Sequence, residues 1–115
     1  MKYLTPLIIL LGLALANPVF AEDAPAGLNA IKQLGSLNGQ ALACADKNAA
    51  AHAKLLMLTH APKTATYGRA YEEATNAGYL AQTKNAASCP DAKTLGKKVD
   101  AVADQLRSAL PAAAK

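Results

Sequence analysis

The side chains best suited to bind a metal are two histidines and a methionine near the middle of this 115-residue sequence. Met57 and His60 stand three positions apart, so a helix would place a thioether sulfur and an imidazole on one side, a pair that suits copper. His52 stands about 80° from His60 around a helix, so the two imidazoles do not chelate one ion. A copper or zinc site at Met57 and His60 is our third hypothesis, beside the simpler interpretation of a core methionine and a histidine at a helix end.

The sequence carries no motif for a cofactor or for catalysis. Covalent haem attachment needs C-x-x-C-H, which does not occur, and neither does a nucleophile elbow or H-E-x-x-H. Glu72 and Glu73 are adjacent, so on a helix their carboxylates point about 100° apart and cannot act on one bond together. We therefore expect a protein that is not an enzyme and that holds no cofactor.

Polar and aromatic side chains are concentrated between positions 60 and 76. Tyrosine and arginine are enriched at recognition hot spots, so this stretch is the candidate binding surface. Two interpretations of the tyrosines stay open: they contact a partner, or they fill the core where alanine is too small. The candidate residues are His60, Lys63, Tyr67, Arg69, Tyr71, Glu72 and Asn76.

The sequence has two cysteines, Cys44 and Cys89. Redox catalysts usually hold their cysteines as C-x-x-C, and this pair is much farther apart. In an oxidising compartment such a pair is normally a structural disulfide. We predict that Cys44, on the inward stripe of the first helix, pairs with Cys89 at the start of the last.

The first residues are typical of a secretory signal peptide. One lysine, Lys2, precedes an apolar run over 4–16, and small residues lead to a cleavage site after Ala21, with Ala16 as the alternative. Pro18 interrupts the run before it reaches the roughly 20 residues of a membrane span. We predict cleavage, no stable membrane anchor, and a periplasmic or secreted protein.

The remainder, residues 22–115, is predicted to be one helical domain with loose ends at 22–27 and 111–115. Apolar residues recur at helical spacing, and no stretch indicates a strand. The first two segments form either two helices or one bent rod. We predict an all-α, antiparallel up-and-down bundle of three to four helices held by one disulfide. The first three predicted helical segments are 28–48, 49–61 and 66–84. The last predicted helix has Pro90 at its first position and a capping box of Ser88 and Asp91, and it ends before Pro111.

Two local patterns carry packing predictions. Gly35 and Gly39 share a helix face, which indicates close packing of another helix, self-association of two copies, or a turn at that point. The run Leu55–Leu58 is apolar all round, which favours a central, well-covered helix.

The composition narrows the class of partner. Loss of residues 1–21 removes one of 12 Lys and Arg residues and none of 8 Asp and Glu residues, so the net charge falls from +4 to +3. This modest charge, with acids and bases interspersed, disfavours nucleic acid. We expect an exported, non-enzymatic protein that binds another protein in a bacterial periplasm. In its layout, a signal peptide, helices and the widely spaced pair Cys44 and Cys89, the chain is similar to small periplasmic acid-stress chaperones; that resemblance implies client binding as the second hypothesis.

Overall fold

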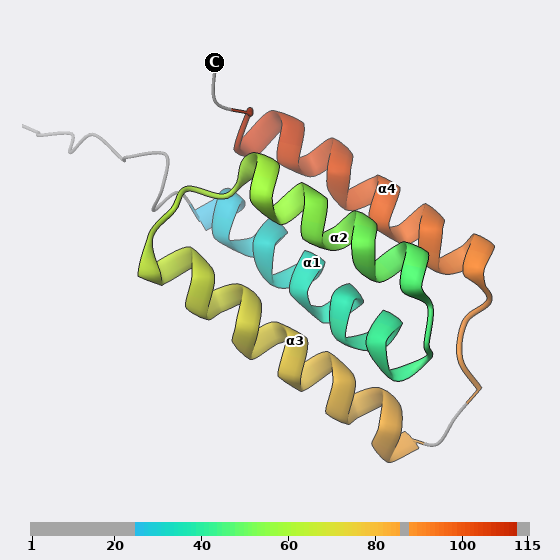
Figure 1. The fold of residues 1–115 in the computed structure, drawn as a ribbon. Helices are drawn as coiled ribbons and strands as arrows, with labels where there is room; N and C mark the ends of the chain where they lie inside the picture. Colours follow the sequence, from blue (N-terminus) through green and yellow to red (C-terminus); the bar gives the residue numbers. More distant parts are fainter. Residues whose placement is uncertain (1–24, 86–87, 113–115) are drawn as a thin grey trace, which may run out of the picture.

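A computed structural model describes residues 25–85 and 88–112, and the predicted signal peptide lies outside them. The described part of the chain is all-helical and carries one disulfide, between Cys44 and Cys89, so the predicted fold class is confirmed. The helices are α1 (Pro25–Ala43), α2 (Lys47–His60), α3 (Ala65–Asn85) and α4 (Ala92–Ala109) (Figure 1).

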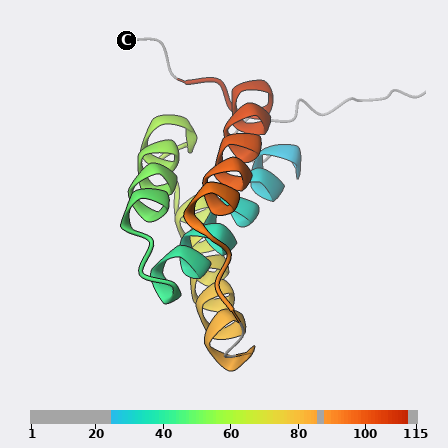
Figure 2. The same ribbon diagram turned by 90° about the vertical axis from the view of Figure 1, so that its right-hand side faces the viewer.

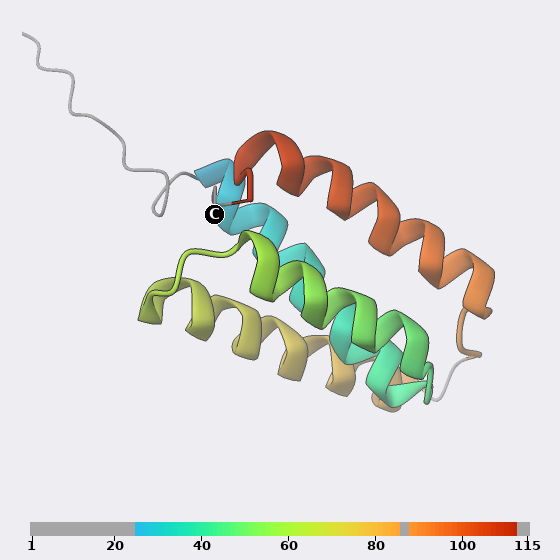
Figure 3. The same ribbon diagram turned by 45° about the horizontal axis from the view of Figure 1, so that its top comes forward.

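Helix α1 lies at the centre and contacts each of the other three helices. Helices α2 and α4 pack against each other and against α1, whereas α3 lies along α1 and makes little contact with either (Figures 2 and 3). Consecutive helices alternate in direction, so α3 runs parallel to the helix that it contacts most (Figure 1). The bundle is therefore a three-helix core with a fourth helix attached to its central member.

The first helix begins and ends earlier than predicted. Pro25 occupies its first turn, where a missing N–H costs nothing. Residues 25–27, predicted as loose, are helical, and Gly27 is buried. At the other end Ala45 has φ 58°, a left-handed conformation that no helix interior contains. Asp46 then caps α2, because its carboxylate accepts a hydrogen bond from the Ala49 N–H at 3.0 Å. The first two segments are thus two helices, and Cys44 lies in the turn between them rather than on a helical stripe.

The start of the last helix also differs from the prediction. Asp91 is itself the N-cap and accepts a hydrogen bond from the Thr94 N–H at 2.7 Å, so the capping box with Ser88 is wrong. This bond, with one to the Thr94 side chain, lowers the pKa of the Asp91 carboxyl. Pro90 precedes the helix instead of opening it. The helix ends at Ala109, before Pro111 as predicted.

The apolar core lies between α1, α2 and α4, and Tyr67 of α3 belongs to it. The predicted stripe of α4 is buried along its whole length and packs against Ile31 and Leu34, which are both 0% exposed. Helix α2 packs against α1 and α4 partly through small side chains, since Ala49 and Ala53 are buried there. The stripe residues are Leu95, Val99, Val102, Leu106 and Leu110.

Helix α2 is less covered than its sequence predicts. Of its run of four large apolar residues only Leu56 is buried; Leu55 is 59% and Leu58 is 57% exposed. The reason is geometric, because α1 and α4 cover only one side of α2 and nothing in the described chain covers the opposite side. The prediction of a central, well-covered helix is therefore wrong.

Candidate functional site

The candidate site lies where the chain turns from α2 to α3. The Ala61 N–H still bonds to the Met57 carbonyl at 3.0 Å, and Pro62 then takes the chain out of the helix. The Lys63 ammonium donates to the Leu58 carbonyl at 3.0 Å, which satisfies one of the last carbonyls of α2. The turn is thus held by its own backbone and by Lys63.

A hollow of about 260 Å³ opens beside this turn. Its lining is mostly apolar, with Lys63 and Thr64 as the only polar side chains. Gly68 contributes open space, since a Cβ atom built there would meet nothing within 4 Å. The lining residues are Met57, Leu58, Ala61, Pro62, Lys63, Thr64 and Gly68, which we call the corner hollow.

His60 lies behind the corner and joins two helix ends. Its Nδ1 lies 2.7 Å from the Leu110 carbonyl oxygen. Because a carbonyl only accepts, Nδ1 carries the proton and donates it, which leaves Nε2 as the remaining nitrogen for any ligand. The described residues hold no group of three or more His, Cys, Asp or Glu side chains placed to bind a metal. The evident contribution of His60 is therefore to hold the end of α2 against the end of α4.

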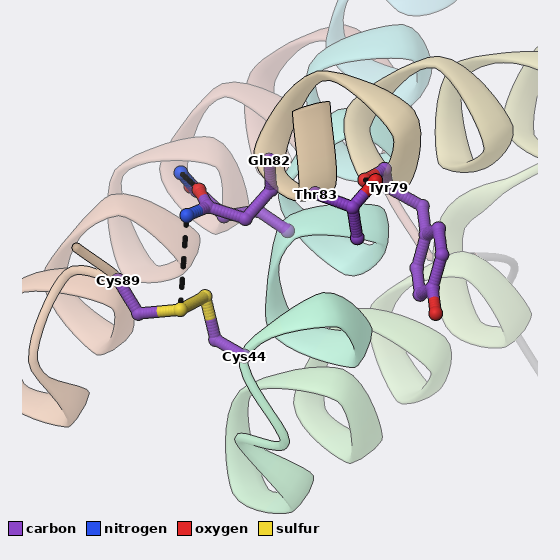
Figure 4. Close-up of a disulfide and its surroundings, with 6 residues drawn as sticks. Cys44, Tyr79, Gln82, Thr83 and Cys89 are labelled. Atoms are coloured by element: carbon purple, nitrogen blue, oxygen red, sulfur yellow. Dashed lines mark hydrogen bonds between the residues drawn. A yellow bond between two sulfur atoms is a disulfide. The ribbon is translucent and has the colours of Figure 1, made fainter. Parts of the chain in front are cut away.

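The three tyrosines of α3 have three different surroundings. Tyr67 is 0% exposed and belongs to the core, so it does not contact a partner in this fold. Tyr71 is half-buried, and its hydroxyl is buried with no hydrogen-bond partner among the described residues. That burial raises the pKa of Tyr71 to about 12. Tyr79 is 43% exposed and points away from the disulfide (Figure 4).

The structure separates the remaining predicted residues. Arg69, Glu72 and Asn76 are exposed and, at spacings of three and four, share the face of α3 that is turned away from α1. Lys63 alone among the predicted surface residues lines the corner hollow. The sequence prediction of the binding surface omits Gly68 and Leu58, because it places Leu58 on a covered helix. The available signal for Gly68 is a glycine in the first turn of α3, where it leaves open space.

Gly35 and Gly39 lie against α3. A Cβ atom on Gly39 would stand 2.1 Å from the Thr75 carbonyl oxygen, and one on Gly78 of α3 would stand 2.3 Å from the Ser36 carbonyl oxygen. The two backbones are therefore in direct contact, which only glycine permits. The helix is continuous through both glycines, so no turn forms there. This face is filled within one chain and is not free for self-association. We call it the glycine seam.

The disulfide lies at the end of the bundle opposite the corner. Cys44 in the α1–α2 turn and Cys89 in the α3–α4 connection have their Cα atoms 5.8 Å apart. Gln82 accepts from Gln40 at 2.8 Å and lies 3.7 Å from the Cys89 sulfur, so polar side chains flank the bond (Figure 4). Together they tie the end of α3 to the end of α1.

Among the described residues no helix has the length and hydropathy to cross a membrane. Comparison of the chain with protein-family models, curated proteins and solved structures found no match.

Proposed function

We propose that this protein is an exported, non-enzymatic binding protein that holds another protein through the corner hollow. The observation that carries the proposal is the hollow itself, an apolar depression between two helices with a lysine at its rim. Its volume of about 260 Å³ lies below the roughly 300–1,000 Å³ typical of small-molecule sites. A depression of this size suits one or two apolar side chains of a partner protein.

The charges around the corner favour an acidic partner. Lys63 and Arg69 are both exposed, and no acidic residue occurs between Asp46 and Glu72. A partner that places a leucine or phenylalanine in the hollow and a carboxylate beside Lys63 would combine apolar burial with charge complementarity. The carboxylate would fix the orientation of the partner more than it would add affinity.

Export is part of the proposal. The Cys44–Cys89 disulfide is compatible with an oxidising compartment. The N-terminal pattern of a cationic residue, an apolar run and small residues before Ala21 supports cleavage and release into the periplasm. Within that compartment the hollow would act as the recognition element of an accessory protein.

The test uses two matched glycines. Gly68 and Gly96 both lie in helices, and a Cβ atom at either would meet nothing within 4 Å. Gly68→Leu fills the corner hollow, whereas Gly96→Leu makes the same change on α4. With a photo-reactive residue in place of the exposed Ala65, next to Thr64 of the hollow, we expect a crosslink to one partner in intact periplasm that Gly68→Leu abolishes and Gly96→Leu preserves. Equal crosslinking in both variants would remove the corner as the site.

A second function, chaperone activity on unfolded clients, is favoured by the exposed apolar surface. Leu42, Leu55, Leu58 and Leu80 are each more than half exposed and offer apolar surface to an unfolded client. The measurement is light scattering from an aggregating client at low pH with and without the protein. Absence of protection would count against this function and leave the corner proposal untouched.

A further inference from the structure

The outer face of α2 carries a compact apolar arc. Ala51, Leu55 and Leu58 follow one another at spacings of four and three, so they lie on one side of the helix. All three are exposed, and the opposite side of α2 faces the core through Ala53 and Leu56. We call Ala51, Leu55 and Leu58 the outer arc.

The net positive charge of the whole chain falls in the sequence segment that contains this arc. Residues 47–71 hold four of the 12 Lys and Arg residues and none of the 8 Asp and Glu residues. The other 8 basic residues equal the 8 acidic ones in number, so the net charge of +4 falls entirely in this segment. Its basic residues are Lys47, Lys54, Lys63 and Arg69, all exposed.

Two of these lysines lie beside the leucines of the outer arc, so both kinds of side chain can contact one surface. Lys47 and Lys54 are seven positions apart and lie on one flank of the outer arc. The nearest acidic groups are engaged elsewhere, because Asp46 caps α2 and Asp100 lies 3.9 Å from His52 on the side of α4. Within α2 itself the flank beside the leucines carries two lysines and no acidic side chain.

We propose that α2 binds the surface of an anionic lipid bilayer, with the outer arc at the level of the headgroups and Lys47 and Lys54 on the phosphates. A helix with leucines on one arc, flanking lysines and no acids has the chemistry of an interfacial helix. Each lysine near an anionic surface strengthens binding about fivefold. A second copy is a poorer occupant, since it would bring the same lysines face to face. The contact is peripheral and reversible, distinct from a membrane anchor, and it shares Leu58 with the corner hollow.

The experiment is flotation of the mature protein with phosphatidylcholine vesicles that contain or lack phosphatidylglycerol. We expect binding to the anionic vesicles alone, weakened by salt because exposed charges are screened. Lys47→Gln with Lys54→Gln should lower the partition coefficient about 25-fold, from two factors of about five. The matched control is Lys97→Gln with Lys98→Gln on α4, which removes the same charge and should have little effect.

The apolar contribution has its own control. Leu55→Ser should weaken vesicle binding about tenfold, by loss of buried leucine surface. Leu80→Ser, at a leucine of α3 that is 60% exposed, should not. Leu55 is chosen because Leu58 also lines the corner hollow.

Three results would overturn the proposal. The first is no binding to anionic vesicles, and the second is equal loss in the α4 lysine control, which would indicate unspecific attraction. The third is binding to a synthetic acidic amphipathic helix without binding to vesicles, which would assign the outer arc to a protein helix. Each result is independent of the corner crosslink, so failure here and failure of the proposed function are distinguishable.

Discussion

Helix α1 packs in two different ways on its two sides. Toward α2 and α4 it presents Ile31 and Leu34, and the contact is made by interlocking apolar side chains. Toward α3 it presents Gly35 and Gly39, and the contact is made by backbone against backbone. The first contact is stabilised in proportion to buried area, whereas the second depends on the close fit of two backbones at the glycines.

This difference determines how α3 is held. Because α3 makes little contact with α2 or α4, it is held by the glycine seam, by Tyr67 in the core, by the hydrogen bond from Gln40 to Gln82, by its two connections and by the disulfide at its far end. The corner hollow lies between the two regions, with walls from α2 and from Gly68 of α3. A shift of α3 along α1 would therefore change the shape of the proposed binding site.

The largest effect is expected from removal of the disulfide, which joins the two regions covalently. Cys44→Ser with Cys89→Ser opens a link across a sequence separation of 45. Release of that constraint on the unfolded chain should lower the free energy of unfolding by about 4 kcal/mol. Urea denaturation of the oxidised and the doubly substituted proteins measures it, and equal midpoints would show that the link is dispensable.

The next largest effect is expected from a substitution in the glycine seam. Gly39→Ala places a methyl group 2.1 Å from the Thr75 carbonyl oxygen, so the helices must separate. We expect a loss of about 1–3 kcal/mol from overpacking, even though alanine favours the helix by about 1 kcal/mol. Thermal melting measures it. Equal or higher stability would mean that the two backbones are not in contact.

Tyr71 tests the packing of α3 against the rest of the bundle. Its hydroxyl is buried without a hydrogen-bond partner among the described residues. Tyr71→Phe removes an unsatisfied polar group and should raise the free energy of unfolding by about 1 kcal/mol. Tyr79→Phe, at an exposed hydroxyl, is the control and should change nothing.

The same residue predicts an alkaline pH dependence. Burial raises the folded-state pKa of Tyr71 to about 12, above the ordinary tyrosine pKa of 10.0 that holds in the unfolded chain. The unfolded state therefore loses its proton first, and the stability present below pH 10 is lost as the pH rises toward 12. Between these values Tyr71→Phe should lose less stability than the parent protein. Equal losses of unfolding free energy in the parent protein and in Tyr71→Phe between pH 10 and 12 would contradict the assignment.

The smallest effects come from glycines outside the seam. Gly68→Ala and Gly96→Ala add a Cβ atom that meets nothing, so each should stabilise by about 0.5–1 kcal/mol through helix propensity. The contrast in sign with Gly39→Ala is the sharpest form of the comparison. A destabilised Gly96→Ala protein would show that contact at the Cβ position does not determine the sign of the effect.

Much of this fold follows from local patterns. The spacing of Leu95, Val99 and Leu106 fixes the buried face of α4, and the two cysteines predict their own pairing. The end of α1 was not predictable, since alanine at position 45 gives no signal for its left-handed conformation. The site was only partly predictable. Helical periodicity cannot tell whether Leu55 is covered, because coverage depends on which helices pack there.

The glycine spacing predicts a close contact without naming its partner, and α3 supplies it. The tyrosines show the same limit, since Tyr67 and Tyr71 lie four positions apart on one face yet differ in burial. Tyr67 lies near Gly27 at the start of α1 and near Leu110 at the end of α4. The sequence of α3 alone does not indicate where those helices begin and end.

Hydrogen exchange of the backbone amides in Gly39→Ala tests most directly whether α1 supports two separately built regions. We expect faster exchange across α3 while the amides of α2 and α4 keep the protection of the parent protein, because the side-chain core does not include the seam. Equal acceleration in all four helices would contradict the account and show one cooperative core.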